Sequence, residues 1–309
     1  MNRQDNFPVV SVIVPNYNHA VFLQQRLDSI FKQTFTGYEL ILLDDCSSDG
    51  SRELLETFRT HANVSHVVLN ETNSGSTFLQ WKKGITLAKG KYIWIAESDD
   101  FCDSDFLKTA VDKLEAGADI FAAKTLNVNE SGTIISYHNS WMDDISATRW
   151  EADYESNGPD EIAFALAVKN TIPNASGVVF RLDEQTLPLL DESAGMRYCG
   201  DWLFWMNYLS GGKKLYYSAA TCNYFRNHPA VTRHSHSREL RNKEISKILR
   251  YALSQAKGTE RKKFLVRYYF REHYHVFPRR SLGKNSSLFF QQISVSPRFF
   301  SCWWKYYFS

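Results

Sequence analysis

The sequence contains few cysteines and lacks any long apolar run. Its five cysteines, among 309 residues, stand singly, with an odd total and no Cys-x-x-Cys pair. This pattern argues against a disulfide framework and against a cysteine zinc site, and it fits a reducing cytoplasm. The apolar run at 9–14 is too short for a signal peptide, and nowhere do about 18 apolar residues follow one another, as a spanning helix requires. We therefore expect a cytoplasmic protein that neither carries a signal peptide nor spans a membrane.

The net charge is small but unevenly distributed. The whole chain carries +2, yet residues 261–309 hold ten lysines and arginines against one acid, Glu272. This segment therefore carries about +9 and the preceding 260 residues about −7. The same segment is rich in aromatic residues and ends in RFFSCWWKYYFS. With 43% hydrophobic residues, the chain has enough apolar side chains for one large domain or two smaller ones.

The first third of the chain alternates between short apolar runs and helical periodicity. The runs at 9–14, 38–45, 64–69 and 91–96 are typical of buried strands, and apolar residues recur at helical spacing between them. Such alternation predicts an α/β fold in which helices flank a mostly parallel sheet on both faces. Ligands bind beyond the carboxyl ends of the strands in these sheets. The polar clusters that follow three of these runs should therefore converge on one edge.

Beyond the fourth run the alternation weakens. The pattern predicts a strand at 118–123, a hairpin around Gly132, and helices at 160–168 and 200–209. After Arg238 the chain becomes basic and helical and then strongly aromatic, so we expect a helical extension at the C-terminal side.

Three acids stand within four positions at the end of the fourth run: Glu97, Asp99 and Asp100 in GKYIWIAESDDF. Mutual repulsion raises the cost of keeping all three ionised. They are either solvated turn and helix-capping residues or ligands of Mg²⁺ or Mn²⁺, which bind carboxylates together with substrate phosphates. Asp45, at the end of the second run, poses the same choice between a turn residue and an acceptor of hydrogen bonds from a nucleotide.

Two longer segments carry a family resemblance. VSVIVPNYNHAVFLQQRLDSIFKQTFTGYELILLDDCSSDGS (10–51) and NSGSTFLQWKKGITLAKGKYIWIAESDDF (73–101) closely resemble the family 2 glycosyltransferases. Members of this family are inverting, metal-dependent enzymes with the single-domain, Rossmann-like fold called GT-A. The resemblance is dense over residues 9–125 and thinner over residues 170–235.

The resemblance implies which residues bind a nucleotide-sugar donor. Pro15, Tyr17 and Asn18 match the family's Pro-x-Tyr-Asn element, in which the tyrosine stacks on the nucleobase. Asp45 matches the second acid of an Asp-Asp pair that binds the base, usually uracil. Asp99 matches an acid that faces the ribose. A UDP-sugar is therefore the expected donor.

The resemblance also implies a metal ion, Mn²⁺ or Mg²⁺. Asp100 matches the acid that reaches the metal, and Glu97 stands where this element usually has an aspartate. His228, in an Arg-x-His element with Arg226, matches a histidine that can complete the metal shell, and imidazole suits manganese better than magnesium. Lone histidines are more often structural, which is the alternative here. Two further histidines follow in the same segment, His234 and His236.

The acceptor side is implied by two shorter matches, whereas a third segment departs from the family pattern on the donor side. Asp201 in CGDWLFW matches the family's acid at the start of an acceptor-side helix, where it would take the proton of the acceptor hydroxyl. A helix N-terminal acid favoured by the macrodipole is the alternative. Asn174 and Ser176 lie in TIPNAS, which resembles the loop that shapes the acceptor pocket. In QWKKGI, where the family often has an arginine and an asparagine, Lys82 either meets a phosphate or stands on a solvated helix face.

The expected organisation has three parts. Residues 1–125 form the nucleotide-sugar-binding half of a GT-A domain, 126–237 the acceptor-binding half, and 238–309 a basic, aromatic helical extension. Tryptophan and tyrosine favour the lipid headgroup level and cations favour anionic lipid, so the extension is expected to bind the inner face of the cytoplasmic membrane. The alternatives are a helical cap packed on the domain or a dimer contact. Nucleic acid is not expected as a partner, because no recognisable RNA-binding module accompanies the aromatic residues.

The expected function is transfer of a hexose from a UDP-sugar, with inversion, to a lipid-linked glycan, as in O-antigen or capsule assembly. A sugar nucleotidyltransferase, one rival, would place a glycine-rich phosphate loop where this chain has PNYNHA (15–20). An NAD enzyme is disfavoured by the missing Gly-x-Gly-x-x-Gly. The other rival, a nucleotide-sugar-binding or glycan-binding module without catalysis, would have no need for Asp201.

Overall fold

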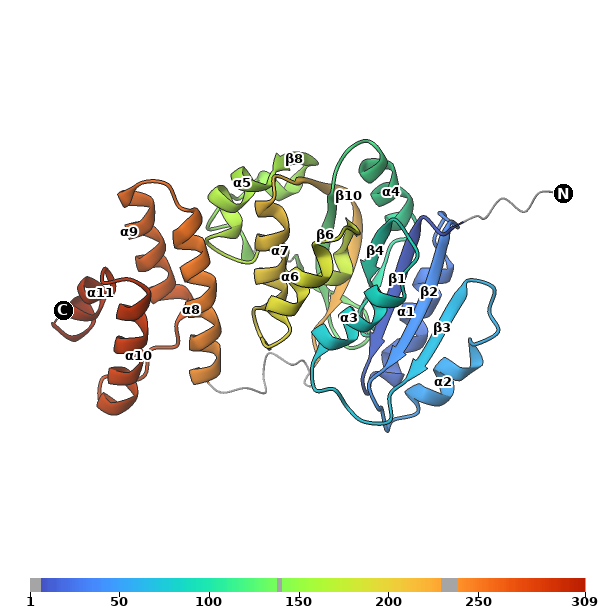
Figure 1. The fold of residues 1–309 in the computed structure, drawn as a ribbon, viewed down its shortest axis with the longest axis horizontal. Coiled ribbons are helices and arrows are strands. Elements are labelled where there is room, and N and C mark those ends of the chain that lie inside the picture. Colours follow the sequence, from blue (N-terminus) through green and yellow to red (C-terminus); the bar gives the residue numbers. More distant parts are fainter. Residues whose placement is uncertain (1–6, 138–140, 229–237, 309) are drawn as a thin grey trace.

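The computed structural model describes residues 7–137, 141–228 and 238–308. The described residues form a ten-stranded sheet with helices on both faces (Figure 1). The strand order is β3-β2-β1-β4-β9-β6-β10-β5, with β7 paired to β6 and β8 paired to β10. The α/β fold predicted from the sequence is confirmed, and so is its helical extension.

The strands are β1 (Val10–Asn16), β2 (Tyr38–Asp44), β3 (Val64–Leu69), β4 (Tyr92–Ile95), β5 (Phe101–Cys102), β6 (Ile120–Val128), β7 (Ile134–Tyr137), β8 (Tyr154–Asn157), β9 (Val178–Arg181) and β10 (Lys214–Arg226). The helices are α1 (Ala20–Phe31), α2 (Ser51–Thr57), α3 (Thr77–Leu87), α4 (Phe106–Glu115), α5 (Gly158–Glu161), α6 (Thr186–Ser193), α7 (Gly200–Ser210), α8 (Arg238–Gln255), α9 (Thr259–Tyr268), α10 (Leu282–Val295) and α11 (Phe299–Phe308).

The sheet is parallel in its first half and mixed in its second. Strands β3, β2, β1 and β4 are parallel neighbours, as the alternation of strands and helices predicts. Strand β9 then runs antiparallel to β4 on one side and to β6 on the other, and β10 returns parallel to β6. The hairpin predicted around Gly132 is formed by β6 and β7. The mixed half of the sheet joins the parallel half through the pairing of β9 with β4.

Strand β1 lies at the centre of two apolar layers. All seven of its residues are buried, as expected for a central strand with helices on both faces. Alternate side chains enter opposite layers: Val12 packs beneath α1, and Ile13 packs beneath α3. Helix α3 approaches β1 closely because Gly84 has no side chain; a Cβ there would lie 2.3 Å from Ile13 Cγ2.

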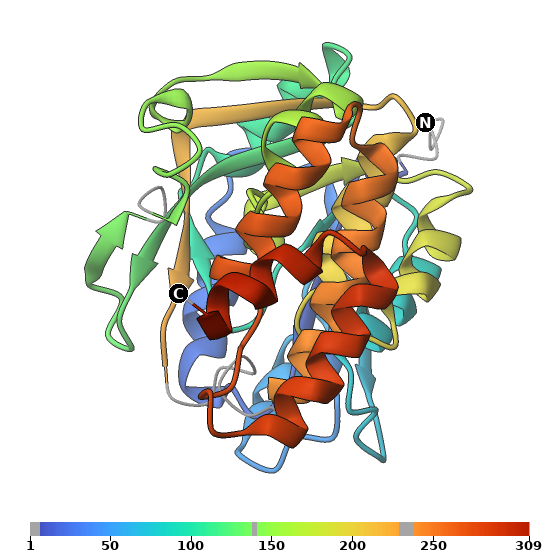
Figure 2. The same cartoon turned by 90° about the vertical axis from the view of Figure 1, so that its left-hand side faces the viewer.

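The C-terminal helices share the core of one layer instead of forming a detached tail. Helices α1, α2 and α4 cover one face of the sheet, whereas α3, α6 and α7 cover the other (Figure 1). Helices α8 to α11 stack outside α7, at the end of the molecule away from β3 (Figures 1 and 2). Leu249 and Trp303 belong to the same apolar cluster as Trp202 and Trp205 of α7. Within the described residues, no helix combines the length and the apolar character needed to cross a membrane.

Candidate active site

The loop that follows β1 is tied to the loop that follows β2. Asn16 donates to Asp44 (2.9 Å) and to the Ser47 hydroxyl (3.2 Å), which also accepts from the Asn18 backbone N–H (2.9 Å). Asn18 has φ 55°, in the left-handed region that few residues other than glycine occupy. Tyr17, between these anchored residues, is 48% exposed. The loop therefore presents an accessible aromatic ring on a fixed backbone.

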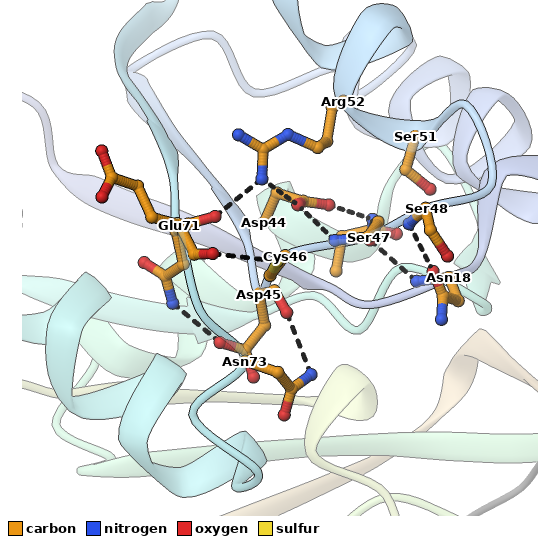
Figure 3. A network of polar contacts seen from close by, with 12 residues as sticks. Asn18, Asp44, Asp45, Cys46, Ser47, Ser48, Ser51, Arg52, Glu71 and Asn73 are labelled. Carbon is orange, nitrogen blue, oxygen red and sulfur yellow. Dashed lines mark hydrogen bonds and ion pairs between the residues drawn. The ribbon is translucent and has the colours of Figure 1, made fainter.

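The loop after β2 is fastened from its other side as well (Figure 3). Cys46 also has a left-handed backbone, with φ 66°, and its thiol contacts the Glu71 carbonyl oxygen at 3.3 Å. Arg52 of α2 lies 3.8 Å from the Asp44 carboxylate. Strained backbone of this kind persists only where surrounding contacts hold it, and it occurs often at ligand sites.

Asp45 is buried in a cradle of hydrogen-bond donors. Its Oδ1 accepts from Asn70 (2.7 Å), the Ser74 backbone N–H (2.9 Å) and the Gln80 amide (2.8 Å). Its Oδ2 accepts from the Ser74 hydroxyl (2.8 Å). A carboxylate offers about four acceptor sites, two on each oxygen, so Oδ2 retains room for a further donor.

Glu97 lies just beyond β4, with its carboxylate beside a tryptophan and its carbonyl oxygen accepting from Arg26 Nε at 2.8 Å. Trp81 Nε1 donates to its carboxylate at 2.8 Å, and its backbone N–H donates to the Ser176 hydroxyl at 3.1 Å. Burial, reinforced by the charge of Asp99, raises the pKa of Glu97 to about 8. Its carboxyl is therefore mostly protonated at neutral pH when no cation is bound nearby.

Asp99 forms a compact group with two histidines. His228 Nε2 lies 3.0 Å from Asp99 Oδ2, and the ring of His19 meets that of His228 edge-on at 5.3 Å. The three side chains have ligand atoms within 4.8 Å of one another. Burial lowers the pKa of His19, which favours the neutral imidazole that binds metals. Burial opposes ionisation of Asp99, but the hydrogen bond with His228 and the charges of both histidines lower its pKa.

Asp100 turns into the protein. Its Oδ1 accepts from the Arg226 backbone N–H (2.9 Å) and its Oδ2 from Asn174 (2.9 Å), so both oxygens have protein partners. Burial and the neighbouring charge of Asp99 raise the pKa of Asp100 to about 6. The structure thus brings Asp99, and not Asp100, to His228.

Arg226 is buried and holds the backbone of the acid cluster. Its Nε donates to the Asp99 carbonyl oxygen (2.7 Å), and one Nη donates to Gln25 (2.6 Å). Its guanidinium also stacks over Phe22, 4.7 Å from the ring centre. These contacts fix the guanidinium beneath the turn that carries Asp99 and Asp100.

Asp201 opens the first turn of α7. Its Oδ1 accepts from the Trp202 backbone N–H (2.7 Å) and its Oδ2 from Asn170 (3.1 Å). Burial raises the pKa of Asp201 to about 6, although the side chain keeps some contact with solvent. The preceding Gly200 packs directly on Phe78 of α3, where a Cβ would lie 2.4 Å from the phenylalanine ring.

One loop, residues 170–176, connects Asp201 to the acids after β4. Asn170 donates to Asp201, Asn174 donates to Asp100, and the Ser176 hydroxyl accepts from the backbone of Glu97. Four residue steps separate Asn170 from Asn174, so their Cα atoms lie at most about 15 Å apart. The candidate base and the acid cluster therefore line the same edge of the molecule.

The turn before Asp201 is held by the helical extension. Glu244 of α8 is 3% exposed and accepts three backbone hydrogen bonds, from Arg197 (2.7 Å), Tyr198 (2.8 Å) and Cys199 (3.0 Å). These bonds satisfy backbone N–H groups just before the start of α7. The negative charge of Glu244 also contributes to the raised pKa of Asp201.

Cations near the site fall into two groups. Lys82 is paired with Asp191 of α6, and Lys83 donates to Asn70. By contrast, the exposed Arg197 extends its guanidinium toward Gly75, in the loop that cradles Asp45.

The chain belongs to glycosyl transferase family 2, whose model matches residues 11–170. Glycosyltransferase GlyG of Streptococcus pneumoniae is 36% identical over 124 residues, which cover 40% of this chain and 41% of GlyG. The poly(ribitol-phosphate) β-N-acetylglucosaminyltransferase TarS of Staphylococcus aureus is 34% identical over 125 residues, which cover 40% of this chain and 22% of TarS. The chain thus spans less than half the length of either relative.

Solved structures show the same fold. The structure of S. aureus TarS with UDP-GlcNAc matches 85% of this chain and 73% of that chain, with a TM-score of 0.63 and 19% identity. The mannosyltransferase PcManGT of Pyrobaculum calidifontis, solved with GDP-Man and Mn²⁺, matches 96% of this chain and 76% of that chain, with a TM-score of 0.58 and 15% identity. These matches support the GT-A architecture that the sequence predicts.

The structure adds residues that the sequence analysis did not single out. They are His19, Gln80, Asn170 and Glu244. His19 directly follows the Pro-x-Tyr-Asn element, and this position is the only feature of the sequence that indicates a role for it in the site. Glu244 stands in a polar helix with no motif around it, and only the folded chain reveals its contacts. Pro15 lies buried within β1, whereas His234 and His236 lie outside the described residues.

Proposed function

We propose that this chain is an inverting glycosyltransferase that moves a hexose from a UDP-sugar to a glycan hydroxyl. The observation that carries the proposal is loop 170–176, which hydrogen-bonds Asp201 at one end and Asp100 and the Glu97 backbone at the other. The same loop therefore contacts both a candidate base and a candidate diphosphate site. The structures of TarS with UDP-GlcNAc and with UDP support a UDP donor for this fold.

The nucleoside would bind at the loops after β1 and β2. Tyr17 offers an exposed ring for stacking on uracil, between Pro15 and the anchored Asn18. Asp45 keeps an acceptor site on Oδ2 that suits the uracil N–H, and Gln80 holds the carboxylate in place. Arg197 would supply a cation beside the loop that cradles Asp45, whereas Lys82, for which the sequence left open a phosphate contact, is paired with Asp191.

The donor set of Asp99, His228 and His19 fits a divalent cation, because one carboxylate and two imidazoles lie within binding distance of one another. Mn²⁺ suits this set better than Mg²⁺, and the bound ion would neutralise the diphosphate. The geometry thus supports an exchange of roles relative to the sequence expectation. Asp99 would be the ligand, while Asp100, Asn174 and Ser176 orient the loops around it.

Asp201 is the proposed base. It would accept the proton of the acceptor hydroxyl while the hydroxyl oxygen bonds to the anomeric carbon. The bond from that carbon to the diphosphate oxygen breaks on the opposite face, and UDP leaves. Asn170 fixes the orientation of the carboxylate, and the raised pKa makes it a stronger base than a surface aspartate.

We retain the three-part organisation as a proposal: a donor half over 1–125, an acceptor half over 126–237 and the helical extension over 238–309. A lipid-linked glycan at the inner face of the cytoplasmic membrane, as in O-antigen or capsule assembly, is the proposed acceptor. The charge and aromatic content of the extension support this location.

A donor screen tests the proposal. With Mn²⁺ present, calorimetry should detect binding of UDP-glucose, UDP-galactose or their N-acetyl forms, and weaker binding of GDP-mannose. Release of free UDP should then follow when bacterial lipid-linked glycans are added. Binding of a UDP-sugar without release of UDP for any acceptor would instead support a binding module without catalysis.

Glu244→Gln should change how activity depends on pH. Burial raises the pKa of Asp201 to about 6, so kcat/KM should rise with pH and level off above about 6, because the base works ionised. Loss of the Glu244 charge removes part of the upward shift of the Asp201 pKa. The rise of kcat/KM with pH should therefore occur at lower pH in the variant. Loss of backbone acceptors also loosens residues 197–199, so the plateau should fall by about 10-fold.

Glu239→Gln is the matched control for this prediction, because Glu239 lies on the same helix with its side chain 53% exposed. In that variant kcat/KM should rise at the same pH as in the parent chain and reach the same plateau. If Glu244→Gln lowers the plateau but does not change the pH at which kcat/KM rises, Glu244 stabilises the fold locally without influencing the pKa of Asp201.

A further inference from the structure

Helix α11 has two faces of opposite exposure. Phe299, Cys302 and Trp303 are buried against the core. Three aromatic residues on its other face point to solvent at spacings of four: Phe300 is 59% exposed, Trp304 58% and Phe308 73%. Residues four apart lie on the same side of a helix, so these three form a continuous strip, the outer stripe.

Specific contacts prevent α11 from turning the outer stripe inward. Trp303 Nε1 donates to Gln292 of α10 at 2.6 Å, and the Tyr306 hydroxyl donates to the Phe277 carbonyl oxygen at 2.9 Å. The exposed rings of Trp304 and Phe308 are 4.5 Å apart and pack on each other. The exposure of the stripe is therefore a consequence of how the helix is docked.

Cations flank the outer stripe. Arg298, two residues before Phe300, and Lys305, next to Trp304, are both exposed. Glu272 is the only acid from residue 261 onward, and it is paired with Arg271. On neighbouring α10, Phe290 adds a further exposed ring, 69% accessible.

We propose that the outer stripe and its flanking cations form a docking surface for an anionic lipid bilayer. Tryptophan and phenylalanine insert at the headgroup boundary, and each lysine or arginine near an anionic surface adds about 1 kcal/mol of attraction. A second copy of this chain suits the surface less well, because a symmetric interface would bring like charges together. Helix α11, which carries the surface, lies at the end of the molecule away from β3 (Figure 1).

Point substitutions test this surface better than truncation does. Deletion after residue 284 would remove Leu288, Phe299 and Trp303 from the core, and loss of such side chains destabilises a protein broadly. The test therefore uses the full chain with Phe300→Ser, Trp304→Ser and Phe308→Ser combined. A second variant carries Arg298→Glu and Lys305→Glu.

Matched controls are available elsewhere on the surface. Ile134→Ser with Ile135→Ser removes exposed apolar side chains from β7, where the two isoleucines are 50% and 56% exposed. Lys32→Glu with Lys89→Glu makes the same change in net charge at exposed positions outside the extension. Calorimetric binding of UDP by each variant establishes that the donor half remains folded.

Cosedimentation with vesicles gives the readout. The parent chain and both controls should bind equimolar phosphatidylglycerol–phosphatidylcholine vesicles, less at high salt, and should bind pure phosphatidylcholine weakly. Each of the two test variants should bind the anionic vesicles at least about 10-fold more weakly. Binding by the test variants equal to that of the controls would overturn the proposal. So would a parent chain that ignores anionic vesicles and dimerises, in analytical ultracentrifugation, in a way that the Trp304 variant abolishes.

Discussion

Replacement of Asp201 by asparagine should lower turnover by about 10²- to 10⁴-fold and leave UDP-sugar affinity nearly unchanged, because loss of a general base slows proton removal without altering donor contacts. Asparagine keeps the size of the side chain and one acceptor for the Trp202 backbone N–H. Single-turnover transfer to a glycan acceptor, together with calorimetric donor binding, measures the two quantities separately.

The control is Glu192→Gln, a carboxylate-to-amide change at an exposed residue of nearby α6 that accepts a hydrogen bond from Asn207. It should leave turnover near the parent value. Near-normal turnover of Asp201→Asn would move the base to another acid. Asp153 is a poor replacement, because its oxygens are occupied by Tyr216, Ser218 and the Ala219 backbone.

Asp99→Ala should remove the metal-dependent part of UDP binding, by about 100-fold or more, because it takes away the carboxylate between His19 and His228. Calorimetry with UDP in the presence and absence of Mn²⁺ isolates this part. Affinity measured without metal should change little. A titration of Mn²⁺ alone reports the same loss without reference to the donor.

Asp100→Ala is the informative comparison for Asp99→Ala. It removes the acceptor of the Arg226 backbone N–H and one acceptor of the Asn174 amide, so it should lower the melting temperature more than Asp99→Ala does. If Asp100→Ala abolishes metal-dependent binding at an unchanged melting temperature while Asp99→Ala does not, the metal belongs to Asp100, as the sequence predicted.

The parallel half of the fold could be read from the sequence because its signals are local. Buried parallel strands such as β1 and β2 require runs of β-branched and aliphatic residues, and polar residues end them. The antiparallel insertion of β9 between β4 and β6 depends on which strands meet across the sheet. No residue within VVFR encodes that choice.

The candidate site was predictable in its composition and less so in its orientation. Asp99 and Asp100 are adjacent in an irregular turn, where no helical or strand periodicity tells which side chain faces outward. The fold decides this, because Arg226 and Asn174 draw Asp100 inward. The aromatic C-terminus shows the same limit: Phe299 and Phe300 are alike in sequence, yet one is buried and the other is exposed.

The contact between Glu244 and the turn at 197–199 determines how this chain could be recombined with its relatives. A chimera in which a relative supplies residues 1–125 keeps the hydrogen bonds between Glu244 and the backbone of residues 197–199. A fusion made at residue 237, just before α8, would leave three backbone N–H groups beside Asp201 without acceptors. If the proposed donor half is correct, the portable module for changing the donor would therefore be residues 1–125. The proposed acceptor half would have to be transplanted together with the C-terminal helices.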